Sequence, residues 1–382
     1  MATPFDAVSH SGIAAATGPG SAPPPGQEPA GIPPLSRAAE TSALDHPHPL
    51  RIRPLALTDI PAIVRMRGLV RLDVPESLVH AGSGRPGPGS ALPILRRSRP
   101  TFVAVSAGQT VGFVRFSPRR PDGRWIVTAI AASTGVYDPE PVWDALLAYG
   151  VRTAGLKGVR RLFARVPTGH PLMESMQRAG WAAYGRETVF RADRPARVAP
   201  PAREMRPQEP ADTWAIHQLY AAAVPRQVQE IEALTSHVWD MERDRRSRRS
   251  TRHSGWLLEE HGRLVGYVRF CRSARAGVID AMAAPGDRMH FGQLLDAALS
   301  SQARRRWVPV YCALRGDLLD FQDELTSRGF YAVGEQELMI RYTTATVRTA
   351  ATEPVLFPGE LRPALPRRVP TFLEGQPPDG TA

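Results

Sequence analysis

The sequence predicts two consecutive α/β domains, each built on a mixed β-sheet, between two proline-rich tails. The 382 residues are too many for one ordinary domain and are enough for two of about 150 residues with tails. The central part repeats its pattern at an interval of about 150 residues, and each repeat alternates strand-like and helix-like segments. The 38 Pro and 32 Gly exceed what packed domains carry, so the surplus is expected in the tails.

The tails and the linker are predicted from composition. Residues 1–49 hold few large apolar side chains to offset the entropy lost on ordering, so this tail is predicted to be disordered. Residues 349–382 are also rich in proline and are expected to form a loosely attached tail. Residues 194–203, which include three prolines, form a linker between a domain at 50–193 and a domain at 204–348.

Each half opens with a short strand and a helix. The segment Arg51–Pro54 corresponds to Glu204–Pro207, and an apolar helical pattern follows both. A β-hairpin is predicted next in each half, because alternating apolar residues flank a turn that contains glycine. The hairpins span 102–116, with the turn at Ala107-Gly108, and 256–270, with the turn at His261-Gly262.

The later elements of the two halves also correspond. Each half continues with a strand, a helix, a strand and a short helix, then a glycine suited to a left-handed helix end and an aromatic residue that opens the last strand. In the first half these are 125–132, 139–154, 161–166, the helix from Leu172 to the Gly180-Trp181 step, and a strand ending at Phe190. In the second half they are 278–284, 291–304, 308–314, the helix from Phe321 to the Gly329-Phe330 step, and a strand through 338–340. We expect one mixed sheet per half.

Charge and cysteine content limit the classes of partner. The formal net charge is +11, and residues 50–193 carry 21 basic and 10 acidic side chains whereas 204–349 carry 20 and 19. A nucleic-acid partner is therefore conceivable for the first half alone, although the near absence of lysine indicates a compositional bias. The two cysteines, Cys271 and Cys312, are too few for a disulfide framework or a cysteine-rich zinc site, and they are expected to be buried reduced thiols.

Hydropathy predicts no contact with a membrane. No window approaches the ~18 uninterrupted apolar residues of a membrane-spanning helix, and residues 1–20 lack the pattern of a signal peptide. We therefore expect a soluble, cytoplasmic protein. The oligomeric state is left open.

The order of the elements resembles that of the GNAT-type N-acetyltransferase superfamily, in a tandem arrangement over 50–193 and 204–348. The resemblance rests on motifs that occur twice in the same order: Ile52-Arg-Pro54 and Met205-Arg-Pro207, the Val-Gly-aromatic strands at 111 and 265, and the Gly-aromatic steps at 180 and 329. It implies two acyl-CoA N-acyltransferase folds, acetyl-CoA as the donor, an amine as the acceptor, and direct acyl transfer without a metal.

The family holds the diphosphate of CoA with a glycine-rich loop at a helix N-terminus, where backbone N–H groups neutralise phosphate charge. Neither half has the full loop. In the first half, Asp138 is expected to cap the helix that starts at Pro139, and Glu140 adds a second carboxylate, so this end suits a helix cap better than a phosphate.

The second half keeps part of this loop. Pro285, Arg288 and Gly292 lie roughly where the family has a proline, a basic residue and the last glycine. The functional interpretation is a divergent CoA site in which Arg288, His290 and the amides near Gly292 contact phosphates. The resemblance adds as cofactor contacts Met282, Ala284 and Gln293. The alternative interpretation is an ordinary capped loop with one exposed arginine.

Two further family positions concern proton transfer. Many members have a tyrosine four residues before the Gly-aromatic step as the general acid, and here Met176 and Leu325 stand there, which favours core positions. A thiolate leaving group with a pKa near ~8.5 can depart without strong acid assistance.

Members often have a carboxylate on the fourth strand as the base, and Asp280 matches it, whereas Thr128 is its counterpart in the first half. The alternative role for Asp280 is an ion pair with Arg269 or Arg275.

Three functional hypotheses follow. The leading one is an acetyl-CoA-dependent N-acetyltransferase, with catalysis in the second half and an unidentified amine as acceptor. The second is a non-catalytic GNAT-like module that binds a small ligand or a protein, because both halves lack the full phosphate loop and the tyrosine. The third is nucleic-acid binding by the basic first half, which should weaken steeply with salt.

Overall fold

The computed structural model describes residues 49–80, 99–119, 123–133, 138–194, 205–241, 251–301 and 307–343. The predicted tail up to residue 48, the predicted C-terminal tail and the predicted linker from residue 195 on lie outside these residues.

The first half follows the predicted order of strands and helices. Its strands are β1 (Arg51–Pro54), β2 (Val70–Arg71), β3 (Thr101–Ser106), β4 (Gln109–Arg119), β5 (Arg124–Ala132), β6 (Arg161–Pro167) and β7 (Ala182–Ala192). Its helices are α1 (Ile60–Arg65), α2 (Glu76–His80), α3 (Pro139–Leu156) and α4 (Leu172–Arg178), with the 3₁₀ turn η1 (Leu57–Asp59). The short elements β2 and α2 come in addition to the prediction.

The second half repeats this order. Its strands are β8 (Arg206–Pro207), β9 (Arg252–Glu260), β10 (Arg263–Arg272), β11 (Gly277–Ala283), β12 (Val310–Arg315) and β13 (Tyr331–Tyr342). Its helices are α5 (Thr213–Ala223), α6 (Arg226–Glu232), α8 (Arg288–Ser300) and α9 (Gln322–Thr326), with the 3₁₀ turns η3 (Pro210–Asp212), η4 (Ser236–Trp239) and η5 (Gly316–Phe321). Helix α8 begins at Arg288 rather than at the predicted residue 291, because Asp287 caps it.

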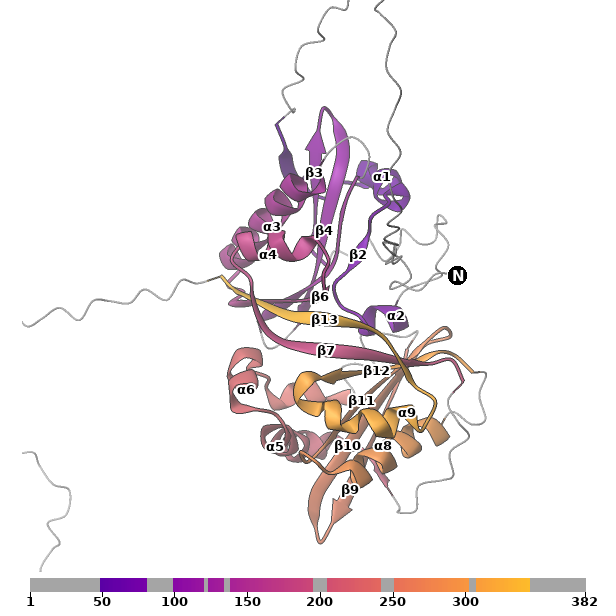
Figure 1. Ribbon diagram of the computed structural model, residues 1–382. Helices are drawn as coiled ribbons and strands as arrows, with labels where there is room; N and C mark the ends of the chain where they lie inside the picture. Colours follow the sequence, from indigo (N-terminus) through magenta and orange to yellow (C-terminus); the bar gives the residue numbers. More distant parts are fainter. Residues whose placement is uncertain are drawn as a thin grey trace, which may run out of the picture. The chain divides into compact units, whose positions relative to one another are not determined.

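The two halves share one sheet, where one sheet per half was expected. The strand order is β1-β3-β4-β5-β6-β13-β7-β12-β11-β10-β9-β8, and β2 pairs with β5 (Figure 1). The last strand of the second half, β13, lies between β6 and β7, and β7 in turn lies beside β12. Both neighbours of β7 therefore come from the second half. Alternating hydrophobicity gives the buried face of a strand but not its partner, so the sequence could not show this exchange.

The Gly-aromatic steps are confirmed as helix ends. Gly180 and Gly329 have φ of 77° and 81°, the left-handed region in which glycine carries no steric penalty. The N–H of Trp181 bonds to the carbonyl of Met176 at 3.0 Å, and the N–H of Phe330 bonds to the carbonyl of Leu325 at 3.1 Å. All four of these apolar side chains are buried, so Met176 and Leu325 are core residues as expected.

An equivalent arginine–aspartate ion pair holds the opening strand of each half. Arg53 donates two hydrogen bonds to Asp59, at 2.6 and 2.7 Å, and Arg206 donates two to Asp212, at 2.8 and 2.7 Å. The hydrogen bond from Arg53 holds the pKa of Asp59 below its usual range, and Arg206 does the same for Asp212. This matched pair supports the internal repeat at atomic level.

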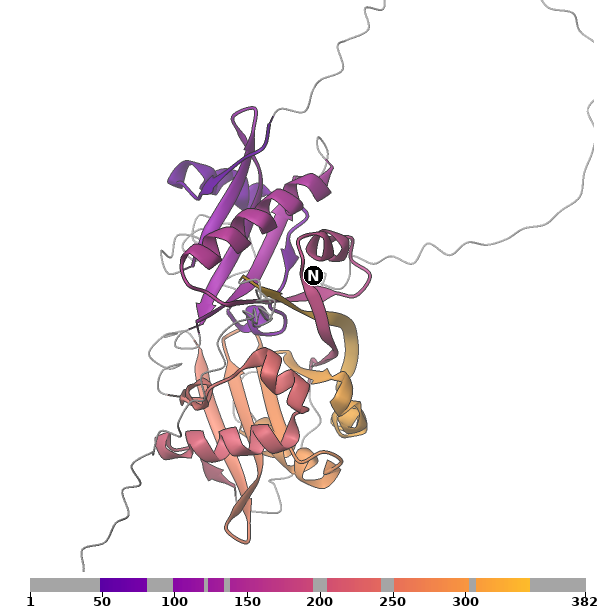
Figure 2. The ribbon, with the colours of Figure 1, turned by 90° about the vertical axis from the view of Figure 1, so that its left-hand side faces the viewer.

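Helices cover both faces of the sheet in the second half (Figure 2). Neighbouring residues on β10 divide between the two sides, because successive side chains of a strand point to opposite faces. Val268 packs in the core under α8, with Leu294 and Leu295, whereas Tyr267 packs in the cluster under α5, with Ile216. The predicted apolar face of the helix at 294–299 is therefore confirmed, and the face opposite α8 carries the site.

Candidate functional site

The site is a cavity of about 400 Å³ on the face of the sheet that lies opposite α8. Both halves line it: α2 and strands β4 to β7 from the first, and α5, α6, η4 and strands β9 to β13 from the second. Its charged and hydroxyl-bearing side chains are Glu76, Arg119, Arg124, Arg165, Tyr184, Glu187, Tyr220, Glu232, Asp240, Arg269, Asp280 and Arg315. A space of this size suits a small molecule.

Parallel strands separate beside this cavity. Strands β11 and β12 pair from Gly277↔Val310 to Ile279↔Cys312, and the pairing ends there although both strands continue. Beyond this point Asp280, Ala281 and Met282 line the cavity from β11. Strands β5 and β6 likewise pair only as far as Ile126↔Phe163, and both of these residues line the cavity. The separation exposes backbone and side chains of β11 to a ligand.

Asp280 forms one of the two ion pairs that the sequence left open, and its carboxylate also lies at the cavity. It lines the cavity, with 52% of its side chain exposed, and its Oδ2 accepts a hydrogen bond of 2.8 Å from Arg269. Arg269 also lies 5.9 Å from the centre of the Trp239 ring. The arginine therefore fixes the direction of the carboxylate while leaving it open to the cavity. Its counterpart Thr128 is buried and donates to the carbonyl of Arg115 at 3.3 Å.

A second carboxylate at the cavity wall, Glu232, accepts hydrogen bonds from two tyrosines. Tyr220 donates to its Oε2 at 2.8 Å and Tyr184 donates to its Oε1 at 3.4 Å. Arg315 lies 3.7 Å from the same carboxylate. Burial raises the pKa of both tyrosines above the usual value, and the charge of Glu232 adds to the effect, so both stay protonated hydrogen-bond donors.

Arg165 forms ion pairs with two carboxylates at the cavity wall. Its Nη1 lies 2.7 Å from Glu76, and its Nε lies 2.8 Å from Glu187. Burial raises the pKa of Glu76, but the attraction of Arg165 outweighs it and the net pKa is lowered; for Glu187, burial prevails and raises the pKa. Gln336 completes the group with a hydrogen bond from its Nε2 to Glu187. The sequence did not group these residues, because they come from four separate elements, α2, β6, β7 and β13.

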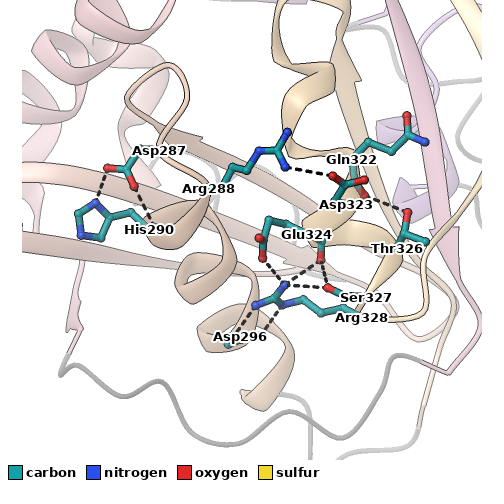
Figure 3. Close-up of polar contacts among 10 residues, drawn as sticks. All are labelled: Asp287, Arg288, His290, Asp296, Gln322, Asp323, Glu324, Thr326, Ser327 and Arg328. Carbon is teal, nitrogen blue, oxygen red and sulfur yellow. Dashed lines mark hydrogen bonds and ion pairs between the residues drawn. The ribbon is translucent and has the colours of Figure 1, made fainter.

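The expected phosphate contacts lie at the N-terminus of α8 (Figure 3). Asp287 caps this helix: its Oδ1 accepts from the N–H of His290 at 3.2 Å, and its Oδ2 lies 2.5 Å from the His290 ring. The other ring nitrogen of His290 lies 2.9 Å from Glu260. His290 is thus enclosed by two carboxylates, with 7% of its side chain exposed.

Two of the other predicted contacts around α8, Arg288 and Gly292, also lie against protein groups. Arg288 forms an ion pair of 3.0 Å with Asp323 on α9, which Figure 3 shows. A Cβ at Gly292 would lie 2.5 Å from Glu324, so this glycine serves helix packing. Gln293 has its Oε1 buried without a hydrogen-bond partner among the described residues.

This helix end therefore does not fit the diphosphate of CoA, because carboxylates stand where phosphate oxygens would bind. The alternative from the sequence, a capped loop with an arginine, describes it better. The remaining predicted contact, Ala284, accepts from the N–H of Asp287 at 3.1 Å and so belongs to the same closed turn. In the first half Asp138 caps α3, as expected, and accepts from the N–H of Glu140 at 3.2 Å. Residues 134–137 of that loop lie outside the described part of the chain.

Comparisons with known proteins show the fold. No protein-family model and no curated protein matches the chain. A solved tandem GNAT protein from the clavulanic acid biosynthesis pathway is 18% identical with a TM-score of 0.51, and the match covers 78% of this chain and all of that one. A GCN5-related N-acetyltransferase from Sphaerobacter thermophilus is 15% identical with a TM-score of 0.53, covering 78% and 96%. The chain therefore has the tandem GNAT fold that the resemblance implied.

Other predictions bear on partners. None of the described helices is long and apolar enough to cross a membrane. Within the described ranges, no group of three or more His, Cys, Asp or Glu side chains is arranged to hold a metal ion. A cytoplasmic location and a nucleic-acid partner stay predictions.

Proposed function

We propose that this protein is an N-acyltransferase, and that its second half transfers an acyl group from a thioester to an amine held in the cavity. The observation that carries the proposal is Asp280, a carboxylate open to the cavity at the point where β11 and β12 separate. The tandem GNAT fold supports the reaction class by analogy.

The side chains of the cavity suit an amine acceptor. An ammonium group must lose a proton before its nitrogen can attack a carbonyl carbon, and a carboxylate within hydrogen-bond reach can accept that proton. Arg269 holds Asp280 in place for this role, and Glu232 offers a second negative charge for a cationic acceptor. A thioester needs little help with its leaving group, because a thiolate departs readily.

The donor expected from the resemblance is acetyl-CoA, but the end of α8 does not fit its diphosphate. We therefore infer that the diphosphate adds little to donor binding. Acetyl-CoA and the shorter acetyl-pantetheine should then be used with kcat/KM values within about threefold of each other. A preference for acetyl-CoA of more than about 30-fold would contradict this inference.

The test of the base is Asp280→Asn with Asp323→Asn as the matched control. Asp323 forms an exposed ion pair on α9, away from the cavity. Acylation of a panel of amines is followed by mass spectrometry of the product. We expect kcat/KM to fall by about 10²–10⁴ in the first variant, the range for loss of a general base, and to stay unchanged in the second. Equal rates in wild type and Asp280→Asn would overturn the assignment.

A second candidate is non-catalytic binding of a small ligand in the same cavity. Asp138 and Asp287, which cap the N-termini of α3 and α8, favour it, because a capping carboxylate competes with a phosphate for the same backbone N–H groups. If no thioester is consumed with any amine, and cavity ligands nevertheless raise the melting temperature, this second candidate replaces the first. A ligand present at 100 times its Kd adds about 2.7 kcal/mol to stability, which a thermal-shift assay detects.

A further inference from the structure

A cysteine and a histidine face each other on neighbouring strands of the cavity wall. Cys271 on β10 is paired in register with His253 on β9. The Cys271 Sγ lies 3.7 Å from His253 Nε2, and Thr251 Oγ1 lies 3.2 Å from the same nitrogen. Both Cys271 and His253 line the cavity. His253 is buried and Cys271 is half-buried. Cys271 is therefore more exposed than the buried thiol that the sequence predicted.

This pair lies next to the proposed base. In the β10–β11 pairing, Cys271 stands opposite Val278 and Arg269 stands opposite Asp280. Residues two apart on a strand share a face and lie about 7 Å apart along it. The thiol, the imidazole and the Asp280 carboxylate therefore sit on one face of three neighbouring strands, within reach of one small molecule in the cavity.

The other cysteine has a different environment. Cys312 on β12 is 1% exposed and packs in the core under α8. Burial raises the pKa of its thiol above the usual value, and the charges of Asp280 and Glu187 add to the effect. It should stay an unreactive thiol, which makes it an internal control for Cys271.

We propose that Cys271 is a nucleophile that takes the acyl group from the thioester, with His253 as its base. The inference rests on the proposed acyl transfer and adds a covalent intermediate to it. A thiolate is the nucleophilic form of cysteine, and an adjacent imidazole that accepts the thiol proton produces it.

The reaction balances in two steps. His253 accepts the thiol proton, and Cys271 Sγ attacks the carbonyl carbon of the thioester. The C–S bond of the donor breaks, and the departing thiolate takes the proton from the imidazolium. The acceptor amine then attacks the acyl group on Cys271 and loses a proton to Asp280. Cys271 leaves as a thiolate, which is reprotonated, and the product is an amide.

The test that needs no substrate measures alkylation by iodoacetamide at pH 6.5, where an ordinary cysteine is only about 1% thiolate. Peptide mapping by mass spectrometry gives the rate at each cysteine separately. We expect Cys271 of the folded full chain to react at least 10 times faster than Cys271 of the chain unfolded in urea. Cys312 of the folded chain should react more slowly than in the unfolded chain.

His253→Gln tests the base. Its alkylation rate at Cys271 should fall to or below that of the unfolded chain, while circular dichroism and the slow reaction of Cys312 report whether the variant has folded. Thr251→Ser keeps a hydroxyl beside the histidine and should react as wild type does. Wild-type Cys271 reacting no faster than in the unfolded chain would overturn the proposal, and so would a folded His253→Gln with the wild-type rate.

The acylated form gives a second measurement that separates this inference from the proposed function. Wild type mixed with acetyl-pantetheine and no amine should gain the mass of one acetyl group on Cys271, and Cys271→Ser should gain no thioester. If Cys271 is acetylated but no amine is, the inference stands and the proposed transferase fails. If Cys271→Ser acylates an amine at the wild-type rate, the inference fails and the proposed function stands.

Discussion

Gln336 donates a hydrogen bond to Glu187, and these two residues hold equivalent positions in the two halves, 149 residues apart. They stand opposite each other where β13 pairs with β7. The corresponding strands of the two repeats therefore pair with each other here, and the last strand of each half lies in the sheet between two strands of the other half. The same junction supplies Glu187 to the cavity and pairs it with Arg165.

Removing Glu187 should destabilise the whole sheet. Glu187→Ala would leave Arg165, whose side chain is 26% exposed, with Glu76 alone. It would also remove one of the two acceptors of the buried Gln336, whose Nε2 donates to the Val74 carbonyl as well. Breaking a fully buried ion pair costs about 3–5 kcal/mol, and because Arg165 keeps Glu76 the loss should lie at or below the lower end of this range. Chemical denaturation of the full chain should show this decrease in the free energy of unfolding.

Glu335 on β13 is the matched control for Glu187. Its ion pair with Arg186 spans 3.8 Å, and both side chains are about half exposed. Solvent screens such a pair, so Glu335→Ala should leave the free energy of unfolding close to that of wild type. Similar losses in the two variants would show that burial at Glu187 does not matter.

The first half should not form a stable monomer by itself. Both sheet neighbours of β7, β12 and β13, belong to the second half, so a fragment ending at residue 194 would leave the backbone groups of an 11-residue strand unpaired. Exposed strand edges promote association. We expect this fragment to aggregate or to unfold, and co-expression with residues 195–382 to restore a soluble complex, as measured by size-exclusion chromatography. A monodisperse, cooperatively folded fragment would contradict this prediction.

The order of elements could be predicted from the sequence, whereas the partners of the last strands could not. Turn and cap signals are local, so the Gly180 and Gly329 helix ends, the Asp138 cap and the apolar face of α8 all follow from a few neighbouring residues. In contrast, no local sequence signal indicates that β7 pairs with β13 rather than with β6, because the same alternating pattern of apolar residues suits either pairing.

The same reason explains the mixed result at the site. Asp280 could be singled out because a carboxylate in an apolar strand is unusual. Glu187, Glu232 and Arg165 could not be grouped, because three elements from two halves bring them together. At α8 the sequence singled out Arg288 as a phosphate contact. It could not show that Asp323, 35 residues further along the chain, forms an ion pair with this arginine.

Two glycines of α3 should respond in opposite ways to alanine. A Cβ at Gly150 would lie 2.3 Å from the ring of Phe116, which is fully buried and cannot move aside. Overpacking of this kind costs about 1–3 kcal/mol. A Cβ at Gly155 would meet Thr343 at 3.5 Å, an ordinary contact, so Gly155→Ala should gain up to about 1 kcal/mol from helix propensity. Thermal denaturation should show a lower melting temperature for Gly150→Ala and an equal or higher one for Gly155→Ala. A stabilised Gly150→Ala would contradict the packing of α3 on β4.

Asp73, which lies just before α2, should make stability depend on pH. Burial raises its pKa to about 6, and the nearby charge of Glu76 adds to the effect. Between about pH 4 and pH 6 the folded chain keeps a proton that the unfolded chain releases, so stability falls as the pH rises through this interval and then levels off. A pKa difference of about two corresponds to about 3 kcal/mol.

Asp73→Asn cannot lose this proton, so its stability relative to wild type should increase from pH 4 to about pH 6.5 and stay constant above it. Because other titrating groups are common to both proteins, they cancel in this comparison, and a difference that stays flat from pH 4 to 7.5 would show that Asp73 is not buried as a charged group.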